Sequence, residues 1–256
     1  MIDNKLIPRI VHQTWMGSDP VPELQAVCMA KCFSFCEANG YEHLFWQKKA
    51  NNEIILKSMT SGYGPIGLSS LTLDTRVTDM LTDEKLHPVM KADIMRFVIL
   101  YEIGGFYADL DIEIINIQEK FRQMEYVCGL ELPRLVVCTA FIGSKPKNPA
   151  NKAMIDFILS TYEKIVAGGQ YPRNIWDVLN FTGPDAYTKI LSNFSEVVPF
   201  NPEVFFPLPP YRIQESVTMH YFNGSKKGGW VFDKCDKREC GTCEQKANCN
   251  IIKEKA

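Results

Sequence analysis

The sequence predicts an α/β fold, with a mainly parallel sheet and helices on its faces. Apolar, β-branched runs alternate with segments of helical spacing early in the chain and become irregular later. This is the pattern of strands that pair side by side while helices cover them. Of the 256 residues, 46% are hydrophobic, so one large core or two small ones can form. Ligands of such sheets bind at the carboxyl ends of the strands, where we expect the site.

The first elements follow from apolar spacing and from glycine and proline. Residues 7–15 (IPRIVHQTW) are apolar and β-branched, which favours a buried strand. Residues 21–40 have helical spacing and end at a glycine, and residues 41–46 are a second strand. Residues 51–59 (NNEIILKSM) are predicted to form a short helix, whereas residues 60–86 show no period that places them.

A helix and a strand meet at two glycines in the middle of the chain. Pro88 suits the first position of a helix, where a backbone N–H would have no partner. The helix that it opens ends at Gly104 and Gly105, which suit a left-handed cap. A strand over residues 104–114 is predicted to follow at once.

The rest of the chain alternates between short strands and helices. Two strands, an amphipathic helix and two helical pieces are predicted, over residues 125–132, 136–144, 148–169, 174–181 and 183–194. Residues 196–211 are extended and broken by prolines, and residues 217–231 are expected to hold one strand and a glycine-rich loop.

Three acidic side chains alternate with apolar ones in the predicted strand after the glycines. Asp109, Asp111 and Glu113 would share one face of it. Alternation alone also fits a half-exposed strand with a polar outer face. Aspartate is disfavoured in strands, however, and neighbouring carboxylates repel one another unless a cation lies between them. Because carboxylate oxygens are ligands of Mg²⁺ and Mn²⁺, the pattern also predicts a divalent-metal site.

Four segments resemble glycosyltransferase family 32, whose members transfer sugars from nucleotide donors. Residues 91–113 (KADIMRFVILYEIGGFYADLDIE) resemble the Asp-x-Asp region of that family and the matching block of the clostridial glucosylating toxins. IPRIVHQTW, FTGPDAY and MHYFNGSKKGGW resemble its first strand, its Thr-Gly-Pro block and its closing His…Ser-Trp segment. The resemblance implies a GT-A fold, an α/β fold with a Rossmann-like mixed sheet flanked by helices.

The resemblance also implies a metal site for a nucleoside-diphosphate sugar. Asp109 and Asp111 would hold Mn²⁺ or Mg²⁺, and His220 would close the site as a third ligand. Such an ion offsets the charge that develops on the departing diphosphate. A lone histidine can equally be a structural hydrogen bonder. Glu113 lies beyond the family signal and is expected to be structural or to support the ligands.

Asp93 and Arg96 would complete the catalytic set with Asp109 and Asp111. They are three residues apart on one helix face, where a surface ion pair is the simplest interpretation. They interrupt an otherwise apolar run, however, and charges in apolar surroundings have partners. By resemblance, Asp93 would accept hydrogen bonds from the donor sugar and Arg96 would lie beside the donor.

Further residues are predicted to contact the donor. Trp15 is a candidate stacking platform for the base, and Tyr107 would lie near the ribose. Besides Asp93, Arg96 and Asp109, the predicted donor contacts are His12, Gln13, Trp15, Tyr107, Lys227 and Trp230. Core packing of the aromatic residues and a solvated loop around Lys227 are the open alternatives.

Seven of the nine cysteines fall into two groups. Cys28, Cys32 and Cys36 share one face of the first helix, where buried reduced thiols are expected. The tail holds a spacing that could bind structural Zn²⁺ but matches no common finger, and free thiols or a disulfide remain alternatives. The four tail residues are Cys235, Cys240, Cys243 and Cys249.

Charge and hydropathy exclude some partners. The 28 basic and 30 acidic residues give a net charge of −2, which offers no electrostatic footprint for nucleic acid. No apolar run reaches the length of a membrane span, and the N-terminus lacks a signal-peptide pattern. We therefore expect no transmembrane segment and a cytoplasmic location; the sequence does not indicate an oligomeric state.

The function predicted from the sequence is a metal-dependent glycosyltransferase. It would move a hexose or N-acetylhexosamine from a nucleoside-diphosphate sugar, UDP before GDP, to a hydroxyl of a glycan or protein, with retention implied by resemblance. The alternatives are a carbohydrate- or metal-binding module without turnover and an aspartyl phosphohydrolase, whose Asp-x-Asp-x-Thr motif differs here at Glu113. One domain is predicted over residues 1–256, with a nucleotide-binding half to about 115, an acceptor half with its closing loop over 116–234, and a tail over 235–256.

Overall fold

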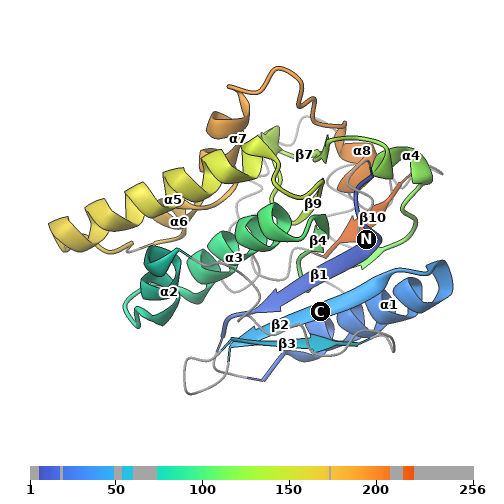
Figure 1. The fold of residues 1–256 in the computed structure, drawn as a ribbon, viewed down its shortest axis with the longest axis horizontal. Helices are drawn as coiled ribbons and strands as arrows, with labels where there is room; N and C mark the ends of the chain where they lie inside the picture. The colour runs from blue at the N-terminus through green and yellow to red at the C-terminus, as the bar shows by residue number, and fades with distance from the viewer. Residues whose placement is uncertain are drawn as a thin grey trace, which may run out of the picture.

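A six-stranded sheet lies at the centre of the described part of the molecule (Figure 1). The computed structural model describes residues 6–17, 20–48, 54–59, 74–172, 174–207 and 216–221. The strands of the sheet lie in the order β3 (Ile54–Ser58), β2 (Glu42–Lys48), β1 (Ile10–Trp15), β4 (Gly105–Ala108), β9 (Phe141–Ser144) and β6 (Tyr126–Val127).

Only the middle of this sheet is parallel. β1 pairs in parallel with β2 and β4, whereas β3, β9 and β6 join in antiparallel fashion. The prediction of a mixed α/β sheet, which the resemblance implied, is therefore confirmed. The prediction of a mainly parallel sheet is wrong, because the strands at both edges are antiparallel. Parallel neighbours need a long crossover, which the short connection between β2 and β3 does not provide.

β3 occupies residues that were predicted to form a helix. It pairs with β2 from Leu44↔Ser58 to Lys48↔Ile54. The prediction was wrong because two β-branched residues, Ile54 and Ile55, favour a strand and an open sheet edge supplies hydrogen bonds. A single short helix gains little without packing.

Helices cover both faces of the sheet and form two apolar cores. One core lies under α3 (Pro88–Glu102) and α5 (Pro149–Gly168), with α2 (Thr75–Thr82) and α7 (Pro184–Leu191) beside them. The other lies under α1 (Glu23–Asn39) and α8 (Pro202–Phe205), and it includes the buried free thiols Cys32 and Cys36. Together with Cys28, these match the expected row of reduced cysteines on the first helix.

Short elements complete the described chain. β5 (Ile112–Ile114) pairs with β10 (Thr218–His220), and β7 (Leu130–Glu131) pairs with β8 (Val136–Val137) as a small hairpin. The remaining helices are α4 (Glu119–Arg122) and α6 (Ile175–Phe181). None of the helices in the described residues is long and apolar enough to span a bilayer.

α3 is almost fully buried from Met90 to Leu100, and its ends are set by local chemistry. The ring of His87 accepts a hydrogen bond from the Val89 N–H at 3.3 Å, and Pro88 occupies the first turn, as predicted. Past the helix end, Gly104 has a φ of 72° and Gly105 a φ of 104°, which L side chains rarely adopt. A Cβ on Gly105 would lie 2.7 Å from the Ile10 carbonyl oxygen, so this glycine permits β4 to lie against β1.

Buried polar side chains connect β1 to its neighbours. The Trp46 indole donates to His12 Nδ1 at 3.2 Å, which leaves the proton on Nε2 to donate to the Gly104 carbonyl at 2.8 Å. His43 Nε2 donates to Gln13 Oε1 at 2.9 Å. Burial lowers the pKa of His12 and of His43 to about 4, so both rings are neutral near neutral pH.

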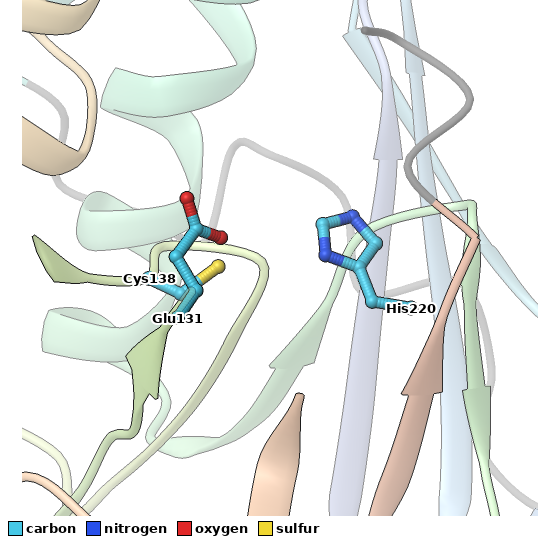
Figure 2. Close-up of side chains that lie close together, drawn as sticks. All are labelled: Glu131, Cys138 and His220. Atoms are coloured by element: carbon cyan, nitrogen blue, oxygen red, sulfur yellow. The ribbon is translucent and has the colours of Figure 1, made fainter. Parts of the chain in front are cut away.

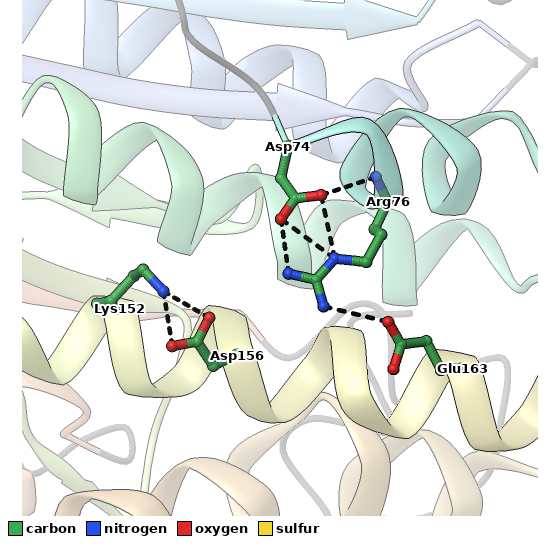
Figure 3. Close-up of polar contacts among 5 residues, drawn as sticks. All are labelled: Asp74, Arg76, Lys152, Asp156 and Glu163. Carbon is green, nitrogen blue, oxygen red and sulfur yellow. Dashed lines mark hydrogen bonds and ion pairs between the residues drawn. The ribbon is translucent and has the colours of Figure 1, made fainter.

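Ion pairs on the outer surface tie α2 to α5 (Figure 3). Arg76 bridges Asp74 at 2.6 Å and Glu163 at 3.1 Å, and Lys152 pairs with Asp156 along α5. Exposed pairs of this kind each contribute less than about 1 kcal/mol. Stability therefore depends mainly on the apolar contacts of α3 and α5.

Ile158→Ala should lower the free energy of unfolding by about 2–5 kcal/mol, because it leaves a cavity beneath α5. Ile158 is fully buried in this core. The matched control is Val166→Ala on the same helix, where the side chain is 48% exposed and little change is expected. Urea unfolding of both variants measures the difference, and equal losses would contradict this assignment of the core.

His43→Gln should make folding less sensitive to acid. The unfolded chain binds a proton at an ordinary histidine pKa, whereas the folded pKa is about 4, so stability is lost as pH falls through this window. When the pH falls from about 7 to about 5, one such histidine lowers the free energy of unfolding by about 2 kcal/mol. Urea unfolding at both pH values should show a smaller loss of unfolding free energy in His43→Gln than in the unchanged protein. The part of the loss that comes from His12 should remain. An unchanged slope would contradict the burial argument.

Candidate functional site

A pocket opens at the carboxyl ends of β1 and β4, where the sheet type predicts a ligand site. Its volume is about 490 Å³. The wall includes residues 14–17 at the end of β1, residues 109–111 after β4 and the first turn of α3. The pocket gathers seven of the predicted site residues: Trp15, Asp93, Arg96, Tyr107, Asp109, Asp111 and His220.

The acidic segment is a tight turn and not a continuous strand. β4 ends at Ala108, the Ile112 N–H donates to the Asp109 carbonyl at 3.0 Å, and β5 begins at Ile112. The prediction of one strand over residues 104–114 is therefore wrong. Aspartate is favoured at the first position of such a turn and disfavoured in a strand, which is the physical reason for the break.

The turn sends the three acids to different places. Asp109 and Asp111 line the pocket, whereas Glu113 does not. The Glu113 carboxylate accepts hydrogen bonds from Lys31 at 2.7 Å and from the Tyr221 hydroxyl at 2.6 Å. The three acids do not share one face, and Glu113 has the structural position expected for it.

Arg96 lies buried between two carboxylates. Its Nη2 is 3.0 Å from Asp93 Oδ1 and 3.1 Å from Asp109 Oδ1, and its Nη1 donates to the Thr139 carbonyl at 2.8 Å. The guanidinium also lies 4.7 Å from the centre of the Tyr107 ring. Its side chain is only 4% exposed. The interpretation of Asp93 and Arg96 as a surface ion pair, which their spacing alone allowed, is therefore wrong.

Asp109 is fixed by the protein on one side and reaches the pocket on the other. The Tyr107 hydroxyl donates to its Oδ1 at 2.8 Å and accepts a hydrogen bond from Thr14 at 3.0 Å. The Asp109 side chain remains 29% exposed. Burial raises its pKa, Arg96 opposes that rise, and the nearby carboxylate of Asp111 adds to it.

Asp93 joins two sequence blocks that lie far apart in the chain. The Thr182 hydroxyl, in the Thr-Gly-Pro block, donates to Asp93 Oδ2 at 2.6 Å. Burial raises the pKa of Asp93 to about 6, against the opposing effects of Arg96 and Thr182. Gly183 and Pro184 of the same block line the pocket. The Thr-Gly-Pro block thus helps to build the wall around Asp93.

His220 reaches the pocket from the last described strand. β10 pairs His220 with Ile112, and the Tyr221 N–H donates to the Asp111 carbonyl at 3.0 Å. His220 Nε2 lies 3.4 Å from Asp111 Oδ1. Burial alone would lower the pKa of His220, but the carboxylates of Asp111, Glu131 and Asp109 outweigh it and raise that pKa.

Two of the predicted donor contacts lie beneath the pocket and not in its wall. His12 and Gln13 are fully buried and bond to the backbone and to neighbouring strands. Gln13 Nε2 donates to the Asp109 carbonyl at 3.4 Å. We expected both residues to contact the donor directly, but neither lines the pocket. Inward-facing residues of a central strand are covered by the helices, which explains their position.

Several other residues complete this comparison. Trp15 and Tyr107 lie in the pocket wall, as a donor contact requires. Asp185 pairs with Arg134 of the β7–β8 turn at 2.7 Å. The predictions for Lys227, Trp230 and the tail cysteines Cys235, Cys240, Cys243 and Cys249 fall outside the described residues.

The β7–β8 hairpin adds two pocket residues that the sequence did not indicate. Glu131 and Cys138 line the pocket close to His220 (Figure 2). Their segments were predicted only as strands, and neither residue belongs to a motif of recognisable spacing. Their proximity to His220 arises from tertiary folding alone.

The donor set at the turn fits a hard divalent cation. Carboxylate oxygens of Asp109 and Asp111 and an imidazole nitrogen of His220 open to one pocket, and Asp111 and His220 are already within 3.4 Å. Oxygen and imidazole donors suit Mn²⁺, and carboxylates with diphosphate oxygens suit Mg²⁺. The residues present therefore agree with the predicted ion.

Comparison with known proteins supports this interpretation of the site. Residues 22–126 match the family described as "Glycosyltransferase sugar-binding region containing DXD motif". This stretch includes Asp93, Arg96, Asp109 and Asp111, and the turn carries the DXD motif itself.

Two curated relatives are mannosyltransferases of fungi. Over 108 residues the chain is 29% identical to inositol phosphoceramide mannosyltransferase 3 of Schizosaccharomyces pombe, covering 41% of this chain and 24% of that protein. Over 167 residues it is 27% identical to the initiation-specific alpha-1,6-mannosyltransferase of Candida albicans, covering 52% and 42% respectively. The chain therefore spans less than half the length of each of these two relatives.

A solved structure shares the fold. The PaToxG glycosyltransferase superposes with a TM-score of 0.50 over 74% of this chain and 70% of that chain, at 16% identity. At this identity the likeness concerns the fold alone, and it agrees with the mixed sheet and flanking helices described above. The predicted resemblance is confirmed: residues 22–126 match a glycosyltransferase sugar-binding region containing a DXD motif, and the fold is of the GT-A type.

Proposed function

We propose that this protein is a metal-dependent glycosyltransferase that takes a nucleoside-diphosphate sugar as donor. The observation that carries the proposal is the Asp109–Asp111 turn, which opens into the pocket beside His220 and lies within the matched sugar-binding region. Mannose is the first sugar to consider, because the two relatives described above are mannosyltransferases. The acceptor would be a hydroxyl of a glycan, lipid or protein.

Asp109, Asp111 and His220 would hold Mn²⁺ or Mg²⁺. The ion would supply Lewis-acid stabilisation of the diphosphate that leaves the donor. Asp109 already accepts hydrogen bonds from Arg96 and Tyr107 through Oδ1, so the protein fixes its orientation before any ligand binds. Such preorganisation is the main source of electrostatic catalysis.

The protein side chains around this position would orient the sugar and the base. Asp93 would accept hydrogen bonds from sugar hydroxyls, and Arg96 would hold its charge beside the donor while it anchors Asp93 and Asp109. Trp15 would stack on the base at the outer end of β1, a contact worth about 1–3 kcal/mol in comparable systems. Retention at the anomeric carbon is the stereochemistry that we propose from the resemblance.

The nucleotide-binding half that the sequence predicts would extend to about residue 115, because it holds the DXD turn and the parallel strands. The acceptor side would then include the β7–β8 hairpin and the start of α7. The Asp185–Arg134 ion pair joins these two segments beside the pocket. The sequence resemblance favours UDP as the nucleotide, whereas the mannosyltransferase relatives favour GDP-mannose, so both nucleotides belong in a donor test.

The principal alternative is a sugar- or metal-binding module without turnover. It predicts the same pocket but no release of a nucleoside diphosphate. An aspartyl phosphohydrolase is disfavoured because Asp109 accepts hydrogen bonds from Arg96 and Tyr107 within a turn and the motif ends in Glu113.

Incubation with a panel of UDP-sugars and GDP-mannose in Mn²⁺ should release a nucleoside diphosphate from at least one donor, and EDTA should abolish the release. Asp111→Asn should reduce the rate by at least about a hundredfold, because it removes charge that holds the ion. Donor binding without release from any donor would favour the module.

The matched control is Glu113→Gln, two residues away. Glu113 pairs with Lys31 outside the pocket, so its loss should leave the rate within about threefold, since exposed pairs contribute less than about 1 kcal/mol. Equal losses in Asp111→Asn and Glu113→Gln would refute the assignment of the metal to the turn.

Thr182→Val should weaken donor binding by about tenfold, because it removes the hydrogen bond that orients Asp93. A hydrogen bond to a charged group contributes about 1.5–3 kcal/mol. The side chain keeps its shape, so the wall of the pocket remains. Thr161→Val on α5 is the control, since its hydroxyl bonds to the Phe157 carbonyl away from the pocket. Donor titration followed by intrinsic fluorescence, alongside urea unfolding, separates a binding defect from a loss of stability.

A further inference from the structure

Three side chains from three separate segments meet on one side of the pocket. Glu131 ends β7, Cys138 follows β8 and His220 ends β10. One ligand atom from each, a carboxylate oxygen, a sulfur and a ring nitrogen, lies within 4.8 Å of the other two. Figure 2 shows the carboxylate and the sulfur turned toward the imidazole ring, which faces them across a small gap.

The hairpin holds two of these groups in place. Glu131 pairs with Val136 across the hairpin, and the Cys138 N–H donates to the Gly129 carbonyl at 2.9 Å, so Cys138 lies diagonally across the hairpin from Glu131. The Cys138 side chain is buried, and the Ala140 N–H lies 3.5 Å from its sulfur as a donor. All three residues line the pocket, so an ion can reach them through it.

The donor set has the chemistry of a zinc site. A thiolate, an imidazole and a carboxylate are ligands that Zn²⁺ takes together, whereas Mg²⁺ and Mn²⁺ prefer oxygen. Ligand atoms around tetrahedral Zn²⁺ lie about 3.4–3.8 Å apart, as bonds of about 2.0–2.3 Å require. In this cluster the three ligand atoms lie at most 4.8 Å from one another. Side-chain movements of about 1 Å would therefore bring them to the separations of a tetrahedral zinc site.

We propose that Glu131, Cys138 and His220 form a second metal site, which takes Zn²⁺ in preference to Mn²⁺ and lies beside the DXD turn. Binding breaks the S–H bond of Cys138, forms a Zn–S bond and releases the proton to solvent, with no change of oxidation state. A carboxylate oxygen of Glu131 and a ring nitrogen of His220 complete three protein ligands. The fourth position faces the pocket and is open to water.

The two metal sites share one histidine. A neutral imidazole offers a single lone pair, and His220 Nε2 also lies 3.4 Å from Asp111. Zn²⁺ at the thiolate site therefore withdraws His220 from an ion held by Asp109 and Asp111. Zn²⁺ should inhibit sugar transfer for this reason; this consequence rests on the proposed function, whereas the zinc site itself does not.

Cobalt absorption tests the site directly. The probe is Co²⁺ added to the full chain in which the four tail cysteines are replaced by serine, so that tail thiolates cannot contribute. A thiolate bound to Co²⁺ gives a charge-transfer band in the near ultraviolet, whereas oxygen and imidazole ligands give none there. We expect this band to saturate at one equivalent of Co²⁺ and to disappear when Zn²⁺ displaces the probe.

Variants assign the band to the three residues. Cys138→Ser should abolish it, and Glu131→Gln should weaken Co²⁺ binding by at least about tenfold, as loss of a ligand or its support does. Cys128→Ser is the matched control, because Cys128 is equally buried near the hairpin but lies outside the cluster. Circular dichroism confirms that each variant is folded.

Three outcomes would overturn the zinc site. They are a near-ultraviolet band that persists in folded Cys138→Ser, a band that is lost in Cys128→Ser instead, and Co²⁺ binding without any such band. The readout needs no sugar donor, so a protein that fails to transfer sugar can still show the site. Conversely, a failed cobalt test leaves the sugar-transfer proposal standing.

Discussion

The buried guanidinium of Arg96 is the interaction on which the pocket depends. It lies 3.0 Å from Asp93 on its own helix and 3.1 Å from Asp109 after β4, and it bonds to the Thr139 carbonyl before β9. A buried ion pair adds little net stability, because desolvation offsets the attraction. Removing its central cation would leave two carboxylates uncompensated. We infer that Arg96 serves chiefly to hold three segments of the pocket in register.

The break between β4 and β5 gives the two aspartates of the DXD motif different surroundings. Asp109 accepts hydrogen bonds from Arg96 and Tyr107, so its orientation is set by the protein. Asp111 lies at the next corner of the turn, beside the imidazole of His220. A continuous strand would have given both carboxylates the same neighbours. The turn instead separates a carboxylate held by Arg96 and Tyr107 from one that lies beside an imidazole.

His220 stands where two kinds of donor group meet. The Asp111 carboxylate of the DXD turn lies 3.4 Å from its Nε2, and the carboxylate and thiol of the β7–β8 hairpin also lie close to its ring (Figure 2 shows the latter two). The hard and the soft donor sets favour different ions, and only one of them can use the imidazole lone pair at a time. The choice of ion at this pocket therefore depends on which metal is present as well as on the protein.

The sequence by itself determined the helix that begins at Pro88, the glycines that end it, and Asp109 and Asp111 as residues that reach the pocket, because caps, left-handed positions and acidic spacing are local. Tertiary structure alone decided the rest. β3 became a strand because an open sheet edge was beside it, His12 and Gln13 were covered by packing, and Glu131 and Cys138 came to His220 through a hairpin. Such contacts join residues far apart in the chain, so no local pattern encodes them.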